Sequence, residues 1–467
     1  MKGILGELPE SLDETYERIL KNINKANRGH ALRLLQCLTV ALRPLRVEEL
    51  AEVLTVDFDA IRRGEIPKSN PSWRLADQQQ AVLSTCSSLI AIVSHGSSQV
   101  VQFSHFSVKE FLISDRLAGS SGDVSLYHIF LEPAHTILAQ ACLGILLRLG
   151  DNDGWREARD IPLALYSAEN WLNHARFGAV SSCISEAMEY FFDENKPHWG
   201  AWCRVYDMEM DIEYRSGSDT FTTTNHPVPL YYAALGGFYD LAERLVVKNP
   251  GRVNAEGGRK RTPLGAALHR NNFHVAELLH RHGADVNWQD SVKWTLLHAA
   301  AYEGNIDAVQ WLLDHGAILN TKRFLRREER LTALHCAAFH GHLPVCRMLV
   351  ERNAYVNARN ELGLTALHVA TTSTNYRDQL DVMRFLIAKG ADVNAQDKDG
   401  CTPLHHSSFW AKAGYVSCTG TIRGSHLLLE HGAKINAKNK RGKTPLRLAL
   451  DTRRYEMAEF LSGMGAR

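Results

Sequence analysis

The histidine of the segment FSHFSVKEFLISDRL, residues 103–117, stands where chemistry is plausible, between a strand-like run and a helix-like run. A histidine can move a proton or contact an anion near neutral pH. The motifs that would accompany such chemistry are missing from the sequence: there is no GxxxxGK[ST], no HExxH, no GxSxG and no CxxC. The cluster GGRKRT at 257–262 is expected to be a turn. The sequence therefore predicts neither an enzyme nor a cofactor.

Four other histidines recur at one place of a TxLH pattern, namely His298, His335, His368 and His405. We expect a ring at that position to hydrogen-bond the neighbouring turn, because a metal site needs convergent ligands that are themselves oriented by hydrogen bonds. The nine cysteines are odd in number and never spaced as CxxC, so they indicate neither a disulfide framework nor zinc ligation. No metal ligand is assigned.

The TxLH pattern is part of a longer repeat in the C-terminal half. Its first threonines are Thr262, Thr295, Thr332, Thr365, Thr402 and Thr444, spaced by 33, 37, 33, 37 and 42 residues. A degenerate earlier copy begins at Val228. Threonine suits a helix N-cap, and the small residues that follow let paired helices approach. Segments 323–330, 372–379 and 411–424 exceed the 33-residue period and are expected as surface loops.

Each second helix should end with a left-handed residue, which favours glycine and tolerates asparagine. The residues at this position are Gly283, Gly316, Asn353, Gly390 and Gly432. With these positions in register, residues 226–467 resemble an ankyrin-repeat array of about seven repeats. The resemblance implies an α-solenoid that binds a protein partner on a concave face, formed by hairpin tips and the exposed side of the first helices.

The N-terminal half is expected to hold three helices, a hairpin around residues 95–98 and a further helix, which is the order of a winged helix. Capping boxes are expected at Ser11 with Glu14 and at Ser107 with Glu110. The segments LPESLDETYERIL, LRPLRVEELAEVL, VQFSHFSVKEFL, EPAHTILAQACLGILL, PLALYSAENWLNHARF and KPHWGAWCRVYD resemble, in order, the region after the NACHT domain of fungal NACHT-ankyrin proteins, relatives of NOD-like receptors.

The fold class predicted is mainly α, with a winged-helix-like domain at 1–120, a helical connector at 121–225 and the ankyrin-repeat domain at 226–467. The resemblance implies that His105 would touch the β-phosphate of ADP in a nucleotide-binding domain. We find no segment of this sequence that resembles such a domain, and expect it to be missing from the front. Without it, we interpret His105 as a half-buried histidine satisfied by the hairpin backbone.

Aromatic and polar residues stand at the variable positions of the repeats, where solvent exposure is expected. The candidate partner-binding residues are Trp294, Tyr302, Glu303, Leu331, Phe339, His340, Phe409 and Trp410. Aromatic anchors carry much of the energy of protein interfaces. The alternative is that these rings pack against the hairpins of the next repeat.

Charge is balanced, with 53 Lys and Arg against 52 Asp and Glu, so no global field indicates nucleic acid or a membrane. The segment that would read DNA, PSWRLADQQQAVLSTC, has one arginine and one aspartate. The longest apolar stretch, TILAQACLGILL, is too short for a bilayer, and no signal peptide is visible, so we expect a cytoplasmic or nuclear protein. Basic clusters in the hairpins could also act as import signals.

Two hypotheses of function follow. The first is a non-enzymatic adaptor, a signalling scaffold or transcription co-regulator, whose partner is a protein such as a transcription factor. The second is the sensor half of a split NACHT switch that controls a NACHT-type NTPase in trans through His105.

Overall fold

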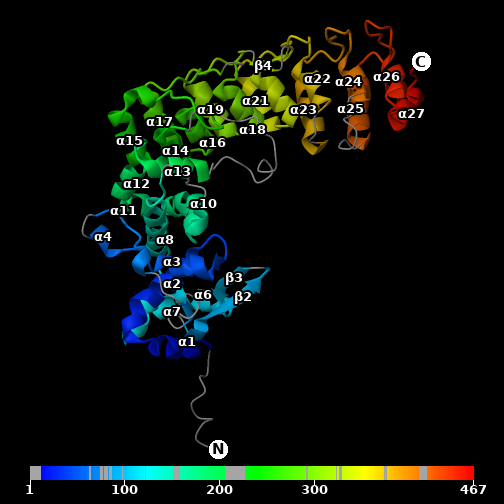
Figure 1. Ribbon diagram of the computed structural model, residues 1–467. Helices are drawn as coiled ribbons and strands as arrows, with labels where there is room; N and C mark the ends of the chain where they lie inside the picture. The colour runs from blue at the N-terminus through cyan, green and yellow to red at the C-terminus, as the bar shows by residue number, and fades with distance from the viewer. Residues whose placement is uncertain are drawn as a thin grey trace, which may run out of the picture. The chain divides into compact units, whose positions relative to one another are not determined.

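The structure, a computed structural model, describes residues 12–205 and 227–467 except 63–64, 74–76, 78–81, 84–86, 97, 121, 151–157, 291–292, 322, 326–328, 373–375 and 410–417. It is mainly helical, which confirms the predicted fold class (Figure 1). The chain divides into two compact units, Met1–Pro263 and Leu264–Arg467.

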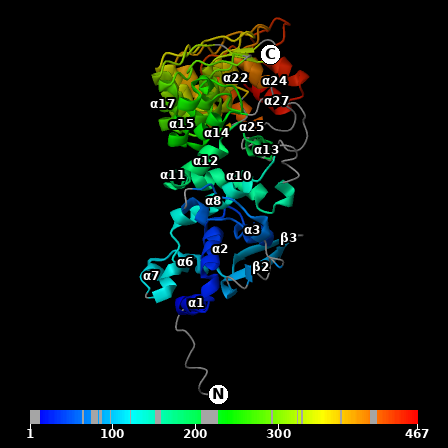
Figure 2. The ribbon, with the colours of Figure 1, turned by 60° about the vertical axis from the view of Figure 1, so that its left-hand side comes forward.

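Unit 1 begins with a small α/β assembly. Helices α1 (Leu12–Lys21), α2 (Arg28–Val40), α3 (Val47–Val53) and α6 (Phe106–Leu112) accompany an antiparallel sheet of order β1-β3-β2, formed by β1 (Leu45–Arg46), β2 (Ile90–His95) and β3 (Ser98–Phe103). Figure 2 shows the β2–β3 hairpin beside α3. Shorter elements are η2 (Lys25–Asn27), α4 (Asp59–Arg62), η3 (Pro71–Trp73), η4 (Ser87–Leu89), α7 (Asp115–Ala118) and η5 (Gly122–Tyr127).

The sheet carries apolar side chains into the core of this assembly. Val101 in β3 lies opposite both Leu45 in β1 and Ile92 in β2, and Val101 and Leu45 are buried. A charged network closes the start of α3, where the buried Glu49 accepts two 2.7 Å hydrogen bonds from Arg43 and one of 2.8 Å from the backbone N–H of Arg46. The predicted helices and hairpin are thus present in the predicted order, as a winged helix requires.

One predicted helix start is wrong. Helix α6 begins at Phe106 with His105 as its N-cap, so Ser107 is the second helical residue and does not cap. The physical reason is that His105, two residues before Ser107, already caps the helix. Its ring Nδ1 accepts a hydrogen bond from the Ser107 N–H at 3.3 Å. The other expected capping residue, Ser11, lies outside the described residues.

The rest of unit 1 is helical. Its elements are α8 (Leu131–Leu146), α10 (Ala164–Ala175), α11 (Val180–Cys183), α12 (Ser185–Phe191), α13 (Pro197–Val205), α14 (Pro229–Gly236), α15 (Tyr239–Lys248) and η7 (Pro250–Arg252). Aromatic rings fill the space between them. Trp202 of α13 lies 5.9 Å from Trp171 of α10, 5.4 Å from Phe191 of α12 and 4.9 Å from Tyr232 of α14, ring centre to ring centre.

Unit 2 is a row of helix pairs in sequence order, joined by hairpin loops along one edge (Figure 1). The pairs are α16 (Pro263–His269) with α17 (Phe273–Arg281), α18 (Leu296–Glu303) with α19 (Ile306–Asp314), α20 (Ala333–His340) with α21 (Leu343–Glu351), α22 (Ala366–Ala370) with α23 (Tyr376–Ala388), α24 (Pro403–Phe409) with α25 (Cys418–Glu430), and α26 (Pro445–Asp451) with α27 (Tyr455–Gly463).

The local signals of the repeat act as predicted. Gly283, Gly316, Gly390 and Gly432 have positive φ angles, and so does Asn353 at φ 70°. Of the expected loops, 323–330 contains the strands β4 (Arg323–Leu325) and β5 (Glu329–Leu331). The other two are only partly loops, because Tyr376–Gln379 belongs to α23 and Cys418–Gly424 to α25. Extra residues in a solenoid can thus lengthen a helix instead of a turn.

Candidate protein-interaction site

The four repeat histidines form a ladder that holds neighbouring repeats at a fixed spacing. The ring Nε2 of His298 lies 2.9 Å from the carbonyl oxygen of Leu331, and since a carbonyl only accepts, Nε2 donates. Nδ1 must then accept, and the hydroxyl of Thr295 donates to it at 2.7 Å. The same pair of bonds recurs at His335, His368 and His405. All four rings are buried, so these histidines serve the fold.

Burial lowers the pKa values of two histidines of the ladder. It lowers the pKa of His368 to about 3, with the nearby ring of His406 adding to the effect. Burial also lowers the pKa of His405. A neutral ring can accept at Nδ1 and donate at Nε2 together, whereas an imidazolium has no acceptor left for the threonine. The ladder therefore requires neutral histidines.

Four rings lie in series beside this ladder, and we call them the aromatic cluster: Trp294, just before α18, Tyr302 of α18, and Phe339 and His340 of α20. The centre of the Tyr302 ring lies 5.8 Å from that of Trp294 and 4.0 Å from that of His340, both edge to face. His340 in turn lies 5.0 Å from Phe339. Tyr302 is 47% exposed, and the other three rings are half-buried. The cluster is a surface feature that crosses from α18 to α20.

Polar contacts fix the backbone under the cluster. The ring of His342 donates from Nε2 to the carbonyl oxygen of Tyr302 at 3.0 Å, and its other side lies against Gly304, where a Cβ would come within 2.6 Å of Nδ1. Glu303 accepts from Nδ1 of His269 at 2.8 Å, across one repeat. Burial, together with His342, lowers the pKa of His340. The backbone that carries the exposed Tyr302 is therefore held in place by side chains of the neighbouring repeats.

The sequence-predicted residues separate into two groups. The cluster brings together Trp294, Tyr302, Phe339 and His340, with Glu303 next to it. Leu331 joins them through its backbone, because its carbonyl is the one that His298 contacts. Phe409 lies elsewhere, with its ring 5.3 Å from that of His406, and among the described residues no ring contact links it to the cluster. Trp410 lies outside the described residues.

Sequence reasoning missed His342 and the ion pair of His269. His342 follows Gly341 at a place where other repeats carry Asn272 or Asn305, and this departure from asparagine was the available signal. His269 stands at a variable position of the repeat, but its ion pair with Glu303 depends on a neighbour 34 residues away. Neither contact can be deduced from spacing within a single repeat.

His105 differs from its expected state. The side chain is exposed, and Nδ1 contacts the Ser107 hydroxyl at 2.6 Å and the Ser107 N–H, so the partner is the start of α6 and not the hairpin backbone. The expected half-burial is thus wrong, because the N-cap position holds the ring outside the core. Its Nε2 has no hydrogen-bond partner among the described residues.

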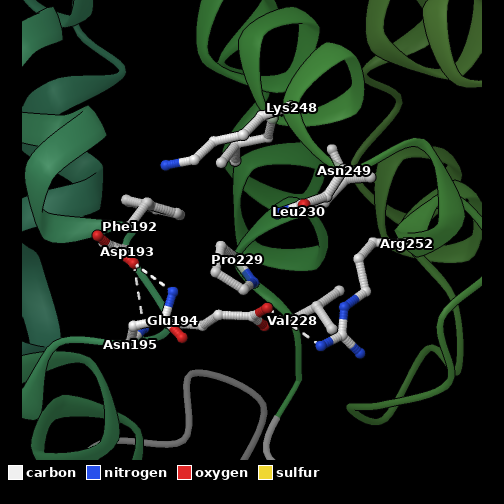
Figure 3. Close-up of a pocket in the computed structure, with 11 residues that line it drawn as sticks. Phe192, Asp193, Glu194, Asn195, Val228, Pro229, Leu230, Lys248, Asn249 and Arg252 are labelled. Atoms are coloured by element: carbon white, nitrogen blue, oxygen red, sulfur yellow. Dashed lines mark hydrogen bonds and ion pairs between the residues drawn. The ribbon is translucent and has the colours of Figure 1, made fainter.

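A small hollow lies in unit 1 between the end of α12 and the pair α14–α15 (Figure 3). Its volume is about 30 Å³, which suits a water molecule better than a substrate. Glu194 and Arg252 form an ion pair of 3.0 Å at its edge, and Asp193 accepts from the backbone and side chain of Asn195. Within the described residues, no group of three or more metal-ligating side chains is present.

Comparison with known families agrees with the repeat geometry. Three copies of the ankyrin-repeats family model match residues 230–323, 319–397 and 375–467, which together make up just over half of the chain. The chain is an ankyrin-repeat protein. In this protein, residues 16–124 also match the winged helix domain of GPI inositol-deacylase, a domain type found in NACHT-containing proteins.

A curated relative is similar in sequence to a large part of this ankyrin-repeat protein. It is the "Azaphilone pigments biosynthesis cluster protein L" of Monascus ruber, 30% identical over an alignment of 303 residues that covers 60% of this chain. The match spans 61% of the relative's own length. Among the helices that the structure describes, none is long and apolar enough to cross a membrane.

Proposed function

We propose that this ankyrin-repeat protein is a non-enzymatic regulatory adaptor that holds a protein partner on the concave face of its repeats, at the aromatic cluster. The observation that supports this most is the ring series Trp294–Tyr302–His340–Phe339, which crosses adjacent repeats and leaves Tyr302 47% exposed. Rigid, partly exposed aromatic side chains bind partners at low entropic cost and act as interface anchors. We also include Glu303, Leu331, Phe409 and Trp410 in the proposed concave face, of which the aromatic cluster is one part.

Its cellular role would be that of a signalling scaffold or of a co-regulator that grips a transcription factor without reading DNA. The name of the Monascus ruber relative connects that protein with a biosynthesis cluster for azaphilone pigments. We include control of such a biosynthetic cluster in the proposal. The domain division 1–120, 121–225 and 226–467 and a cytoplasmic or nuclear location are parts of it as well.

The test is affinity capture of the tagged chain from the cells that produce it, comparing Tyr302→Ala with Tyr355→Ala. Tyr355 is the matched control because it is a 68% exposed tyrosine of the same unit that lies outside the aromatic cluster. We expect Tyr302→Ala to lose the specific partner, since an anchor contributes about 2 kcal/mol or more. Tyr355→Ala should retain it. Equal capture by both variants and the unaltered chain would remove the support for the cluster.

A second function is favoured by the state of His105. The ring is exposed, Nε2 has no partner among the described residues, and the surrounding winged helix is of the NACHT-associated type. These features suit the split-switch hypothesis, in which His105 reaches a nucleotide held by a NACHT-type NTPase in trans. Capture of such an NTPase that survives Tyr302→Ala and is lost with His105→Ala would support it. If His105→Ala changes nothing, the hypothesis fails.

A further inference from the structure

The hairpin that leads into α26 concentrates positive charge. Residues 431–450 contain six lysines and arginines and no aspartate or glutamate, although the whole chain balances 53 cations with 52 anions. The six are Lys434, Lys438, Lys440, Arg441, Lys443 and Arg447. In Figure 1 the hairpin lies on the loop edge of unit 2. A local excess of this kind attracts an anionic group even when the molecule as a whole is neutral.

One carboxylate neutralises part of this charge. Asp451 accepts from Lys443 at 2.8 Å and from Arg447 at 3.1 Å. Lys438, Lys440 and Arg441, which we call the basic hairpin, are exposed, and among the described residues none of the three forms an ion pair. Together with the exposed Lys434, four of the six cations therefore remain available to a ligand.

The basic hairpin is held in one conformation. The side chain of Asn439, only 8% exposed, accepts at Oδ1 from the backbone N–H groups of Arg441 and Lys443, each at 3.0 Å. The N–H of Lys440 donates to the carbonyl oxygen of Asp399 in the preceding hairpin at 2.9 Å. A linear import signal bound as an extended chain would have to break these bonds. A folded partner site needs no such rearrangement, because the loop is ordered already.

The positive region is short. The preceding hairpin adds Lys398, but also the exposed Asp392 and Asp399, while its third carboxylate, Asp397, is occupied by His406 at 2.7 Å. The hairpin before that one carries Arg359 and Glu361, one charge of each sign. Nucleic acid presents a long row of phosphates and is bound by a matching track of cations. A single basic hairpin whose neighbours carry charges of both signs fits a short acidic segment better.

We propose that the basic hairpin binds an acidic segment of the partner protein, a run of several Asp or Glu residues. This inference rests on the proposed adaptor function and adds the charge of the partner to it. Exposed cations of this kind raise the association rate and select against wrong partners more than they add affinity. Binding through the basic hairpin is therefore salt-sensitive, whereas the contact at the aromatic cluster is less so.

The test uses the full chain and a fluorescent twelve-residue peptide of alternating glutamate and serine, measured by fluorescence anisotropy at low and at physiological salt. We expect K438A/K440A/R441A to weaken peptide binding about ten-fold at low salt, since three exposed charge contacts, each weak by itself, are removed together. The matched control is R270A/K293A/K389A, which removes the same charge from three exposed cations scattered over the same unit. It should bind the peptide nearly as the unaltered chain does.

The inference is overturned if the peptide does not bind at low salt or if both triple variants lose equal affinity. It is also overturned if a single-stranded oligonucleotide binds more tightly than the peptide and K438A/K440A/R441A abolishes that binding. Tyr302→Ala should leave peptide affinity unchanged. Failure of the peptide with loss of partner capture in Tyr302→Ala would refute the acidic segment and spare the adaptor. Peptide binding with normal partner capture by Tyr302→Ala would refute the adaptor surface at the aromatic cluster and leave the acidic-segment site in place.

Discussion

Acid should weaken unit 2 through the buried ring of His368. This ring accepts from the backbone N–H of Thr365 at 3.1 Å and from its hydroxyl at 2.9 Å, and it donates to the carbonyl of Cys401 at 3.2 Å. Burial and the neighbouring His406 lower its pKa to about 3 in the folded protein. In the unfolded chain the ring should titrate near the ordinary value of about 6.5.

The sign follows from proton binding. Between these two pKa values the unfolded chain binds a proton that the folded protein does not, so stability is full above pH 6.5 and is lost as the pH falls toward 3. Linkage with these two values gives a loss of about 2 kcal/mol between pH 7.5 and pH 5.0 from this ring alone. That loss is a large fraction of the stability of a typical domain.

The variant His368→Gln separates titration from packing. A glutamine can still donate to one carbonyl and accept from one N–H, but it does not titrate. At pH 7.5 we expect it to cost about 1–3 kcal/mol, because a hydrogen bond of the buried site is lost or distorted. Between pH 7.5 and pH 5.0 it should lose about 2 kcal/mol less than the unaltered chain.

The assay is amide hydrogen exchange in α22, corrected for the intrinsic pH dependence of exchange and converted to a free energy of opening at both pH values. His426→Gln, which changes a half-exposed ring of the same unit, is the control and should follow the unaltered chain. If His368→Gln loses as much stability on acidification as the unaltered chain, another group titrates and the neutral ladder is not the cause.

Two further outcomes can be checked on the same protein. In thermal unfolding, Gly304→Ala should destabilise unit 2 more than Gly316→Ala. Both residues have positive φ angles, but only at Gly304 would the new Cβ meet a ring, that of His342 at 2.6 Å. Equal effects would show that the His342 ring moves aside freely. Under native conditions a thiol reagent should label the exposed Cys183 quickly and Cys142 only after unfolding, because burial raises the pKa of Cys142 to about 12; rapid labelling of Cys142 would mean that unit 1 opens readily.

The parts of the fold that the sequence predicts well depend on contacts a few residues apart. The hydroxyl of Thr295 and the ring of His298 are three residues apart, and the left-handed conformation at Gly316 or Asn353 depends on the residue itself. The threonine–histidine pair recurs in four copies, so an error in one of these repeats is corrected by the others. The failed capping box at Ser107 occurs once, in the winged helix, where no repetition could correct it.

The candidate site could be predicted only in part for the same reason. The repeat period places Tyr302 at a variable position, where solvent exposure is expected, and the side chain is 47% exposed. Its 4.0 Å contact with His340 depends on how two repeats stack, and the bond from His342 to its carbonyl depends on a residue 40 positions away. Spacing alone does not say that Phe409 lies apart from this group.

The aromatic core of unit 1 explains why the repeats and the compact units have different limits. The ankyrin match begins at residue 230, yet the first unit extends to Pro263. Helix α14 lies between these limits and is buried along its whole length, with Tyr232 packed 5.7 Å from Trp199 and 4.9 Å from Trp202 of α13. An exposed repeat end would leave such apolar side chains in water, so a solenoid needs a cover at its end. Here α13 covers α14, the first repeat-type helix, and packing, not sequence period, decides where the unit ends.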